Sequence, residues 1–171
     1  MKIVLNGIPG TGKTTIAALL SKALNLPFVT ERFENNPYLK PGSCAPAWKI
    51  SNYQQCTMIE DYENNASGVF EVSPDAGRAI FVPGEEHQLM EKLPGLVYDF
   101  KFALVADYYI IRDRIIKRNR EGLLETELNC HQERYARYIE WLPNSGSIPI
   151  NAQQTPDEIV NEIIRYINNS N

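Results

Sequence analysis

The sequence contains few of the residues that build disulfide frameworks or metal clusters. Its three cysteines, Cys44, Cys56 and Cys130, lie far apart, and its two histidines, His87 and His131, stand alone. An odd number of widely separated cysteines fits neither a disulfide framework nor a metal cluster. We therefore expect a protein of a reducing cytosol that holds no structural metal.

Excess positive charge and long apolar runs are also lacking. The formal net charge is −4, so the chain has no basic field that would hold a polyanion such as nucleic acid. The apolar segment near the N-terminus is too short for a signal-peptide core, and no run approaches the length of a membrane span. We expect a cytoplasmic protein that binds neither nucleic acid nor membrane, and that holds any anionic ligand in a local site.

The composition, with 43% hydrophobic and 22% charged residues, matches an ordinary soluble domain. A chain of 171 residues can build one sizeable core and is short for two. No internal repeat, low-complexity tract or linker composition divides it. We expect a single domain over residues 1–171.

Short apolar segments alternate with amphipathic segments, a pattern that predicts βαβ units and a parallel sheet. Strands are predicted at 3–5, 27–29, 68–72, 100–105 and 147–151, and helices at 14–24, 48–64, 108–119, 126–142 and after Thr155. The last helix has the clearest start, because Thr155, Pro156 and Glu158 fit a capping box with proline in the first turn. The prediction is a three-layer α/β/α fold around a mostly parallel five-stranded sheet.

A glycine-rich segment, GIPGTGKT at residues 7–14, fits the pattern G-x-x-x-x-G-K-[ST] between a predicted strand and a predicted helix. Its backbone N–H groups and the positive end of the following helix can bind triphosphate oxygens without side chains. Lys13 would reach the β and γ phosphates, and the Thr14 hydroxyl would ligate Mg²⁺. Since the chain has no N-K-x-D guanine-reading motif, ATP is favoured over GTP. The predicted nucleotide-binding residues here are Gly7, Ile8, Pro9, Gly10, Thr11, Gly12, Lys13, Thr14 and Thr15.

A charged pair, Glu31 and Arg32, follows the second predicted strand, at the end where open α/β sheets place their ligands. A carboxylate there could take the proton from an attacking hydroxyl group, as general-base catalysis requires. The alternative is a solvated pair on a surface loop.

Three stretches of the chain together resemble the deoxynucleoside kinase family. They are Glu31-Arg32 followed by Asn36-Pro37-Tyr38-Leu39, the segment DFKFALVADYYIIRDRIIKRNR at 99–120, and the helix LNCHQERYARYIEWL at 128–142. The resemblance implies a P-loop kinase fold with an arginine-rich helical lid at about 112–126. It also allows a homodimer, although the segment between Phe81 and Asp99 is shorter than the family's interface helices.

The resemblance implies roles for residues beyond the P-loop. Glu31 would be the general base for the 5′-hydroxyl group of a nucleoside, and Gln54 would hydrogen-bond its base. The arginines of the lid would close over ATP and stabilise charge on the transferred phosphoryl group. The alternative is an amphipathic helix whose charged side chains are simply exposed to water. The catalytic set would be Glu31, Lys13, Arg118 and Arg120. Further contacts would be Arg114, Arg118, Asn151 and Ala152 to ATP, and Arg32, Tyr38 and Arg78 to the acceptor.

The stretch EVSPDAGRAIF, which begins at Glu71, departs from the family pattern and reads as a turn-rich run between apolar segments. Members have Glu/Asp-Arg-Ser and then Asp-Arg, whereas Val72 replaces the first arginine here and Gly77 the aspartate. Glu71 would still lie near Mg²⁺, and Arg78 keeps the second arginine. Losing one preorganised donor can cost ~3 kcal/mol of transition-state stabilisation. Arg32 is predicted to replace that donor.

Three functions remain open. The first is an ATP-dependent phosphotransferase that phosphorylates the 5′-hydroxyl of a (deoxy)nucleoside. The second is a nucleoside monophosphate kinase of thymidylate-kinase type, in which Arg32 and Arg78 neutralise the acceptor phosphate. The third is a non-catalytic ATP-binding regulatory protein, which the replacements Val72 and Gly77 favour. We expect the first.

Overall fold

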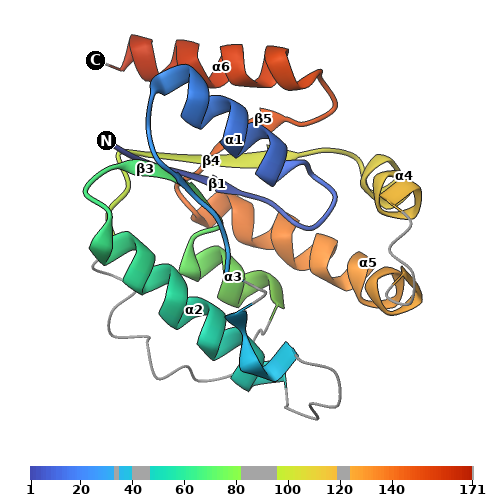
Figure 1. Ribbon diagram of the computed structural model, residues 1–171. Coiled ribbons are helices and arrows are strands. Elements are labelled where there is room, and N and C mark those ends of the chain that lie inside the picture. Colours follow the sequence, from blue (N-terminus) through green and yellow to red (C-terminus); the bar gives the residue numbers. More distant parts are fainter. Residues whose placement is uncertain (33–34, 40–46, 82–95, 119–123, 171) are drawn as a thin grey trace.

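The computed structural model describes residues 1–32, 35–39, 47–81, 96–118 and 124–170 (Figure 1). The strands are β1 (Lys2–Asn6), β2 (Phe28–Val29), β3 (Gly68–Glu71), β4 (Phe100–Val105) and β5 (Ile148–Asn151). The α-helices are α1 (Lys13–Leu24), α2 (Ala47–Asn64), α3 (Pro74–Phe81), α4 (Tyr108–Arg118), α5 (Leu124–Trp141) and α6 (Pro156–Asn169). Short 3₁₀ helices are η2 (Pro37–Leu39) and η4 (Leu142–Asn144).

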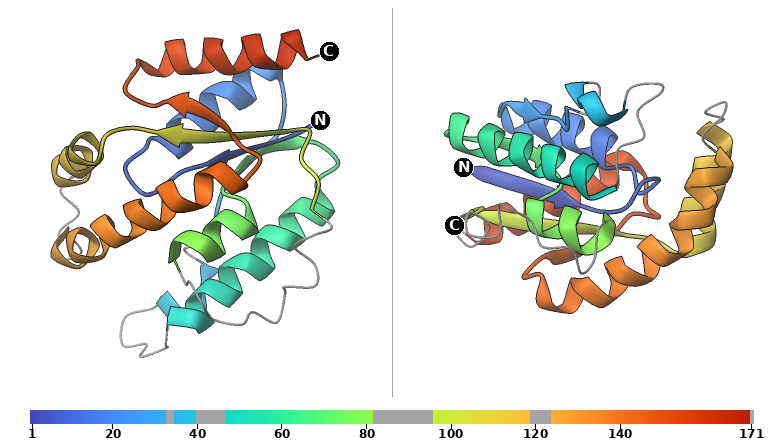
Figure 2. Two further views of the ribbon diagram at one scale, coloured as in Figure 1. Left: turned by 180° about the vertical axis from the view of Figure 1, so that it is seen from behind. Right: turned by 90° about the horizontal axis from the view of Figure 1, so that it is seen from below.

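The five strands form one sheet in the order β2-β3-β1-β4-β5, and every neighbouring pair is parallel. Helices α1 and α6 cover one face, and α2, α3 and α5 lie on the other (Figures 1 and 2). The predicted three-layer α/β/α fold is therefore confirmed, with a sheet that is entirely rather than mostly parallel. Such sheets bind ligands beyond the carboxyl ends of their strands, which here are the ends near Asn6, Glu71 and Val105.

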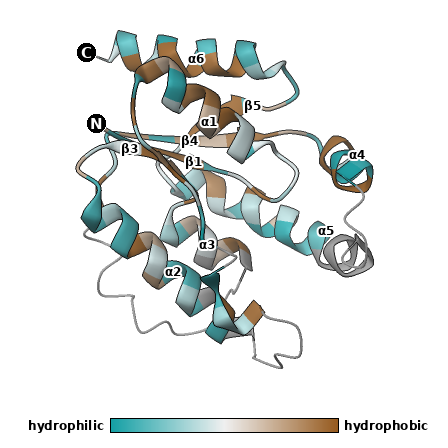
Figure 3. Cartoon of the chain, viewed as in Figure 1, coloured by the Kyte–Doolittle hydropathy of each residue, from teal (hydrophilic) through white to brown (hydrophobic). Residues whose placement is uncertain are grey.

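The core lies on both faces of the central strand β1. Ile3, Val4 and Leu5 are fully buried, as expected for a continuous apolar strand in a parallel sheet covered on both faces. Helix α6 presents a buried stripe to the sheet, and Figure 3 shows its hydrophobic and hydrophilic residues in alternation. Its predicted capping box is present, because Thr155 and Glu158 exchange hydrogen bonds at the start of the helix.

The prediction of a turn-rich run after Glu71 was wrong, because residues 74–81 form helix α3. Pro74 takes the first helical position, where its missing N–H has no intrahelical partner to lose, and Asp75 favours the positive end of the helix. Ala76 and Ile80, four residues apart, are fully buried. Packing of this face outweighs the turn-forming tendency of Asp75 and Gly77.

The other helices and strands are confirmed, with boundaries within about two residues of those predicted. Among the described helices, none combines the length and the apolar character needed to cross a lipid bilayer.

Candidate active site

The segment between β1 and α1 forms a tight loop whose shape depends on glycine. Gly10 and Gly12 have φ values of 91° and 93°, in the left-handed region that favours glycine. A Cβ atom on Gly10 would also lie 2.7 Å from a side-chain carbon of Ile111 on α4. Inside the loop, the hydroxyl of Thr11 and the amine of Lys13 donate to the Ile8 carbonyl, at 2.9 and 3.3 Å. These internal hydrogen bonds fix the shape of the loop. The loop lies at the N-terminus of α1, the end of a helix at which anions bind.

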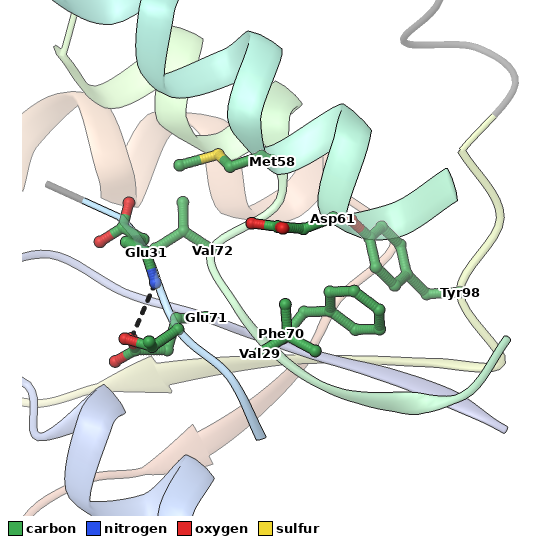
Figure 4. A pocket seen from close by; sticks show the side chains of 9 residues that line it. Val29, Glu31, Met58, Asp61, Phe70, Glu71, Val72 and Tyr98 are labelled. Atoms are coloured by element: carbon green, nitrogen blue, oxygen red, sulfur yellow. Dashed lines mark hydrogen bonds between the residues drawn. The ribbon is translucent and has the colours of Figure 1, made fainter. Parts of the chain in front are cut away.

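Two glutamates, Glu31 and Glu71, lie at the carboxyl ends of β2 and β3. Oε2 of Glu71 accepts a hydrogen bond from the hydroxyl of Thr30 at 2.6 Å. It also accepts one from the backbone N–H of Glu31 at 3.3 Å (Figure 4). Glu71 is buried, whereas Glu31 is partly exposed. Both glutamates interact electrostatically with Lys13 of the loop.

The surroundings of Glu31 shift the pKa of its carboxyl toward neutral pH. Burial raises the pKa of its carboxyl to about 7, Lys13 opposes this rise and the charge of Glu71 adds to it. Burial likewise lowers the pKa of the Lys13 amine, although both glutamates favour its charged form. A carboxyl that titrates near neutral pH can take up and release a proton during a reaction.

A small cavity of about 10 Å³ opens between these carboxylates and α2 (Figure 4). Its described lining contains the carboxylates of Glu31, Asp61 and Glu71 and no cationic side chain. Val72 also lines it, with a φ of 59°, which is an outlier for a β-branched residue. Backbone strain of this kind costs on the order of 1–3 kcal/mol and gathers at functional sites.

A larger cavity, of about 400 Å³, borders the loop itself. It is bounded by Gly10–Gly12, by the basic face of α4 and by the segment between β5 and α6. Arg114 donates to the Ala152 carbonyl at 2.8 Å, which ties α4 to that segment. Lys117 and Arg118 also line the cavity, so it can hold a polyanion next to the loop.

A comparison with known protein families shows the family to which the chain belongs. A family profile described as "AAA domain" matches residues 3–137. The chain belongs to this AAA domain family.

An adenylate kinase from Corynebacterium urealyticum is 25% identical over an alignment of 168 positions. The alignment covers 82% of this AAA domain chain and 85% of that protein. The structure of deoxyadenosine kinase from M. mycoides with bound dATP matches with a TM-score of 0.78 at 19% identity, over 98% of this chain and 100% of that one. The structure with the products dCMP and a flexible dCDP has a TM-score of 0.73 at 19% identity, covering 100% of both chains. These structures confirm the predicted P-loop kinase fold.

The structure of this AAA domain protein brings most of the predicted nucleotide-binding residues together. Of these residues, the larger cavity is lined by Gly10–Gly12, Thr15, Arg114, Arg118 and Ala152. Asn151 is exposed, and its side-chain oxygen accepts the backbone N–H of Gln153 at 3.0 Å. Asn151 therefore lies at the end of β5, next to Ala152, and it is not among the described residues that line the larger cavity.

Arg32 is already engaged by acidic residues of α2. Its guanidinium donates to Asp61 at 3.2 Å and to Glu60 and the Thr57 carbonyl at 3.3 Å. Burial raises the pKa of Asp61, and Arg32 opposes that rise. The hypothesis that Arg32 replaces the missing donor at Val72 therefore requires the guanidinium to leave these partners.

Gln54 is buried on α2 beside the residues that follow β2. Its Oε1 accepts Nδ2 of Asn36 at 3.3 Å, while its Nε2 has no hydrogen-bond partner within the described part of the chain. A buried donor without a partner is costly, so its presence suggests a ligand group that completes it. Tyr38 lies nearby on η2, partly exposed, with its ring against that of Tyr53.

Two predicted residues fall where the structure gives no account of them. Arg120 lies in the undescribed residues 119–123, and the lid predicted at about 112–126 is described only in the α4 and α5 segments that flank them. Arg78 belongs to α3, but its side chain is outside the described part. The roles of both arginines stay predictions.

The predicted Mg²⁺ ligands, Thr14 and Glu71, offer a hydroxyl and a carboxylate, which are oxygen ligands that magnesium sites commonly use. Thr14 is exposed in the first turn of α1. Within the described part of the chain, the hydrogen bonds to the Glu71 side chain fall on Oε2, and Oε1 would then serve a cation or its water. The described residues contain no cluster of three or more potential metal ligands. Magnesium does not need one, since it binds through one or two carboxylates together with substrate phosphates and water.

Sequence reasoning missed several residues of the site. His131 does not stand alone, because its Nε2 lies 3.1 Å from the Pro9 carbonyl of the loop. Lys117 and Gln154 line the larger cavity, and Thr30 holds Glu71. Lys117 could have been found, since it lies next to Arg118 on the predicted basic helix. The others depend on long-range contacts that no local pattern encodes.

Proposed function

We propose that the protein is an ATP-dependent phosphotransferase that phosphorylates the 5′-hydroxyl group of a (deoxy)nucleoside. One observation carries this proposal: Glu31, with a pKa raised to about 7, stands beside the phosphate-binding loop at the carboxyl end of β2. At neutral pH and above, this carboxylate can accept the proton of an attacking hydroxyl group. A phosphate acceptor that is already an anion needs no such base.

The nucleotide would lie in the larger cavity, with its phosphates on the loop. Backbone N–H groups of Gly10–Gly12, together with Lys13, would hold the β and γ phosphates. Arg114 and Arg118, four residues apart on α4, share a helix face and would stabilise charge that develops on the transferred group. Thr14 and Glu71 would hold Mg²⁺, which neutralises phosphate charge when it is bound.

The acceptor would lie between the end of β2 and α2. Gln54 would hydrogen-bond the nucleobase through its unpartnered Nε2, and Tyr38 would contact the acceptor from η2. The described lining of the small cavity carries three carboxylates, and Arg32 beside it is paired with Asp61. Such surroundings repel a phosphate group on the acceptor and favour a neutral nucleoside.

The fold comparison supports the same reading, since the M. mycoides structures are of a deoxyadenosine kinase and hold dATP in one case and dCMP with dCDP in another. A monophosphate acceptor is the second candidate, because the 25% identical relative is an adenylate kinase. For that acceptor, Arg32 would have to exchange Asp61 for the acceptor phosphate.

The proposal is tested by locating the phosphate on the product. Incubation with Mg-ATP and each of the common deoxynucleosides, followed by ³¹P NMR, should show a 5′-monophosphate. The matched 2′,5′-dideoxynucleoside, which lacks only the accepting hydroxyl group, should give no ADP above the rate without acceptor. Equal ADP release with and without the 5′-hydroxyl would overturn the assignment of the acceptor group.

A further inference from the structure

Two buried side chains of α5 contact backbone carbonyls in and beside the phosphate-binding loop. Nε2 of His131 lies 3.1 Å from the carbonyl oxygen of Pro9. The hydroxyl of Tyr138 lies 3.1 Å from the carbonyl oxygen of Leu104 on β4 and 3.3 Å from that of Asn6 at the end of β1. Both side chains are about 1% exposed. Seven residues separate them, which is close to two helical turns, so they stand on the same side of α5.

The partner of His131 fixes the direction of that hydrogen bond. A carbonyl oxygen can only accept, so Nε2 must carry the hydrogen atom and donate it to Pro9. Both the neutral tautomer protonated at Nε2 and the doubly protonated ring satisfy this requirement. The contact therefore does not depend on a change of charge at His131.

The Pro9–Gly10 peptide unit converts this contact into the orientation of a donor. In a trans peptide the carbonyl oxygen of one residue and the N–H of the next point in opposite directions, and the described chain contains no cis peptide. With the Pro9 carbonyl held toward α5, the Gly10 N–H points away from α5. Gly10 lines the larger cavity, so its N–H is directed to the side where the phosphates would bind.

Gly10 is also the position at which the loop could most easily turn this peptide over. Its φ of 91° lies in a region open to glycine, for which several backbone conformations have similar energy. A hydrogen bond from a buried ring restricts that freedom before the nucleotide arrives. Preorganised donors cost no reorganisation when charge binds to them.

We propose that His131 is a positioning residue for nucleotide binding: by donating Nε2–H to the Pro9 carbonyl, it fixes the Pro9–Gly10 peptide with the Gly10 N–H facing the phosphates. The proposal rests on the phosphate-binding part of the proposed function and does not depend on the acceptor.

The test measures the affinity for Mg-ATP by titration calorimetry in four variants. His131→Phe keeps a ring against Tyr108 but has no N–H, and its affinity should fall about tenfold or more. His131→Gln can place an amide N–H near the position of Nε2, and its affinity should stay within about threefold of the parent. His131→Asn is too short to reach, so it should resemble the phenylalanine variant. Tyr135→Phe, the control, alters the other α5 ring that contacts Tyr108 and should change nothing.

Thermal unfolding of each variant separates positioning from folding. If His131→Phe does not fold, the comparison of glutamine with asparagine decides. Once an acceptor is known, KM for ATP should rise in the phenylalanine variant while KM for the acceptor stays unchanged. Equal affinities in all folded variants would overturn the inference and leave the proposed function standing. Failure of the unaltered protein to bind Mg-ATP would overturn both.

Discussion

The backbone N–H of Glu31 donates to Oε2 of Glu71 at 3.3 Å, and this bond joins the ends of β2 and β3 at the candidate site. The same Glu71 oxygen also accepts the Thr30 hydroxyl at 2.6 Å. The negative charge of Glu71 is thereby held close to the Glu31 carboxylate, where it adds to the effect of burial. The arrangement keeps Glu31 poised between its neutral and charged forms near pH 7.

The raised pKa of Glu31 predicts a loss of stability as the pH increases. The pKa rises from 4.5 to about 7 on folding, so the stabilisation is complete below pH 4.5 and is lost as the pH rises through about 7. At pH 8 the ionised carboxylate costs up to about 3 kcal/mol. Glu31→Gln should therefore raise the free energy of unfolding at pH 8 and change it little near pH 4.5, as measured by denaturant unfolding.

The control for this experiment is Glu140→Gln, which removes a carboxylate from the exposed surface of α5. The pH dependence of its stability should follow that of the parent. A Glu31→Gln protein that is no more stable than the parent at pH 8 would show that Glu31 ionises there without cost.

The same substitution should have the opposite effect on activity. If Glu31 is the general base, Glu31→Gln lowers kcat by about a hundredfold or more while affinity for ATP stays nearly intact. In the parent, kcat/KM for the acceptor should rise with pH through about 7, because only the ionised carboxylate accepts a proton. Steady-state kinetics between pH 5 and 9 measure both effects. A kcat within about threefold of the parent would remove Glu31 from this role.

Gln54 should matter more to the acceptor than to the fold. Its Nε2 is buried without a partner, and Asn36, which donates to its Oε1, also donates to the Ile50 carbonyl. Gln54→Leu removes a costly unpaired donor, so the free energy of unfolding should change by less than about 1 kcal/mol. KM for the acceptor should rise about tenfold. An unchanged KM would mean that Nε2 does not contact the acceptor.

Val72 is the position at which the site should be easiest to improve. An arginine there would bring a guanidinium toward the carboxylates of Glu31 and Asp61, and it would lessen the strain that a β-branched residue has at a φ of 59°. Val72→Arg should raise kcat about tenfold or more by adding a hydrogen-bond donor for the transferred phosphoryl group. Its positive charge should also lower the pKa of Glu31 and so move the pH midpoint of kcat/KM for the acceptor below 7. Val72→Leu, which adds length without charge, should do neither. A midpoint that stays at 7 in both variants would contradict this account.

Much of the fold could be predicted from local patterns in the sequence. The apolar run of β1, the glycine spacing of the loop and the capping box at Thr155 each act through neighbouring residues, and the structure confirms all three. Helix α3 was missed because its stability comes from burying Ala76 and Ile80, while its sequence contains residues typical of turns.

The candidate site could be predicted only in part, because some of its contacts join residues that are distant in the sequence. Strand ends carrying Glu31 and Glu71 could be identified from alternating segments, because parallel strands place their carboxyl ends at one edge of a sheet. The pairing of Arg32 with Asp61 and the contact of His131 with Pro9 join residues 29 and 122 positions apart. Such contacts depend on the packing of helices, which a single sequence does not reveal.

The most direct test of the proposed function compares neutral and anionic acceptors. The protein is incubated with Mg-ATP and either a panel of deoxynucleosides or the matching monophosphates, and ADP release is measured. The account predicts turnover with at least one deoxynucleoside, and at least tenfold less with its monophosphate. Turnover with monophosphates alone, or ATP binding without turnover on either panel, would contradict it.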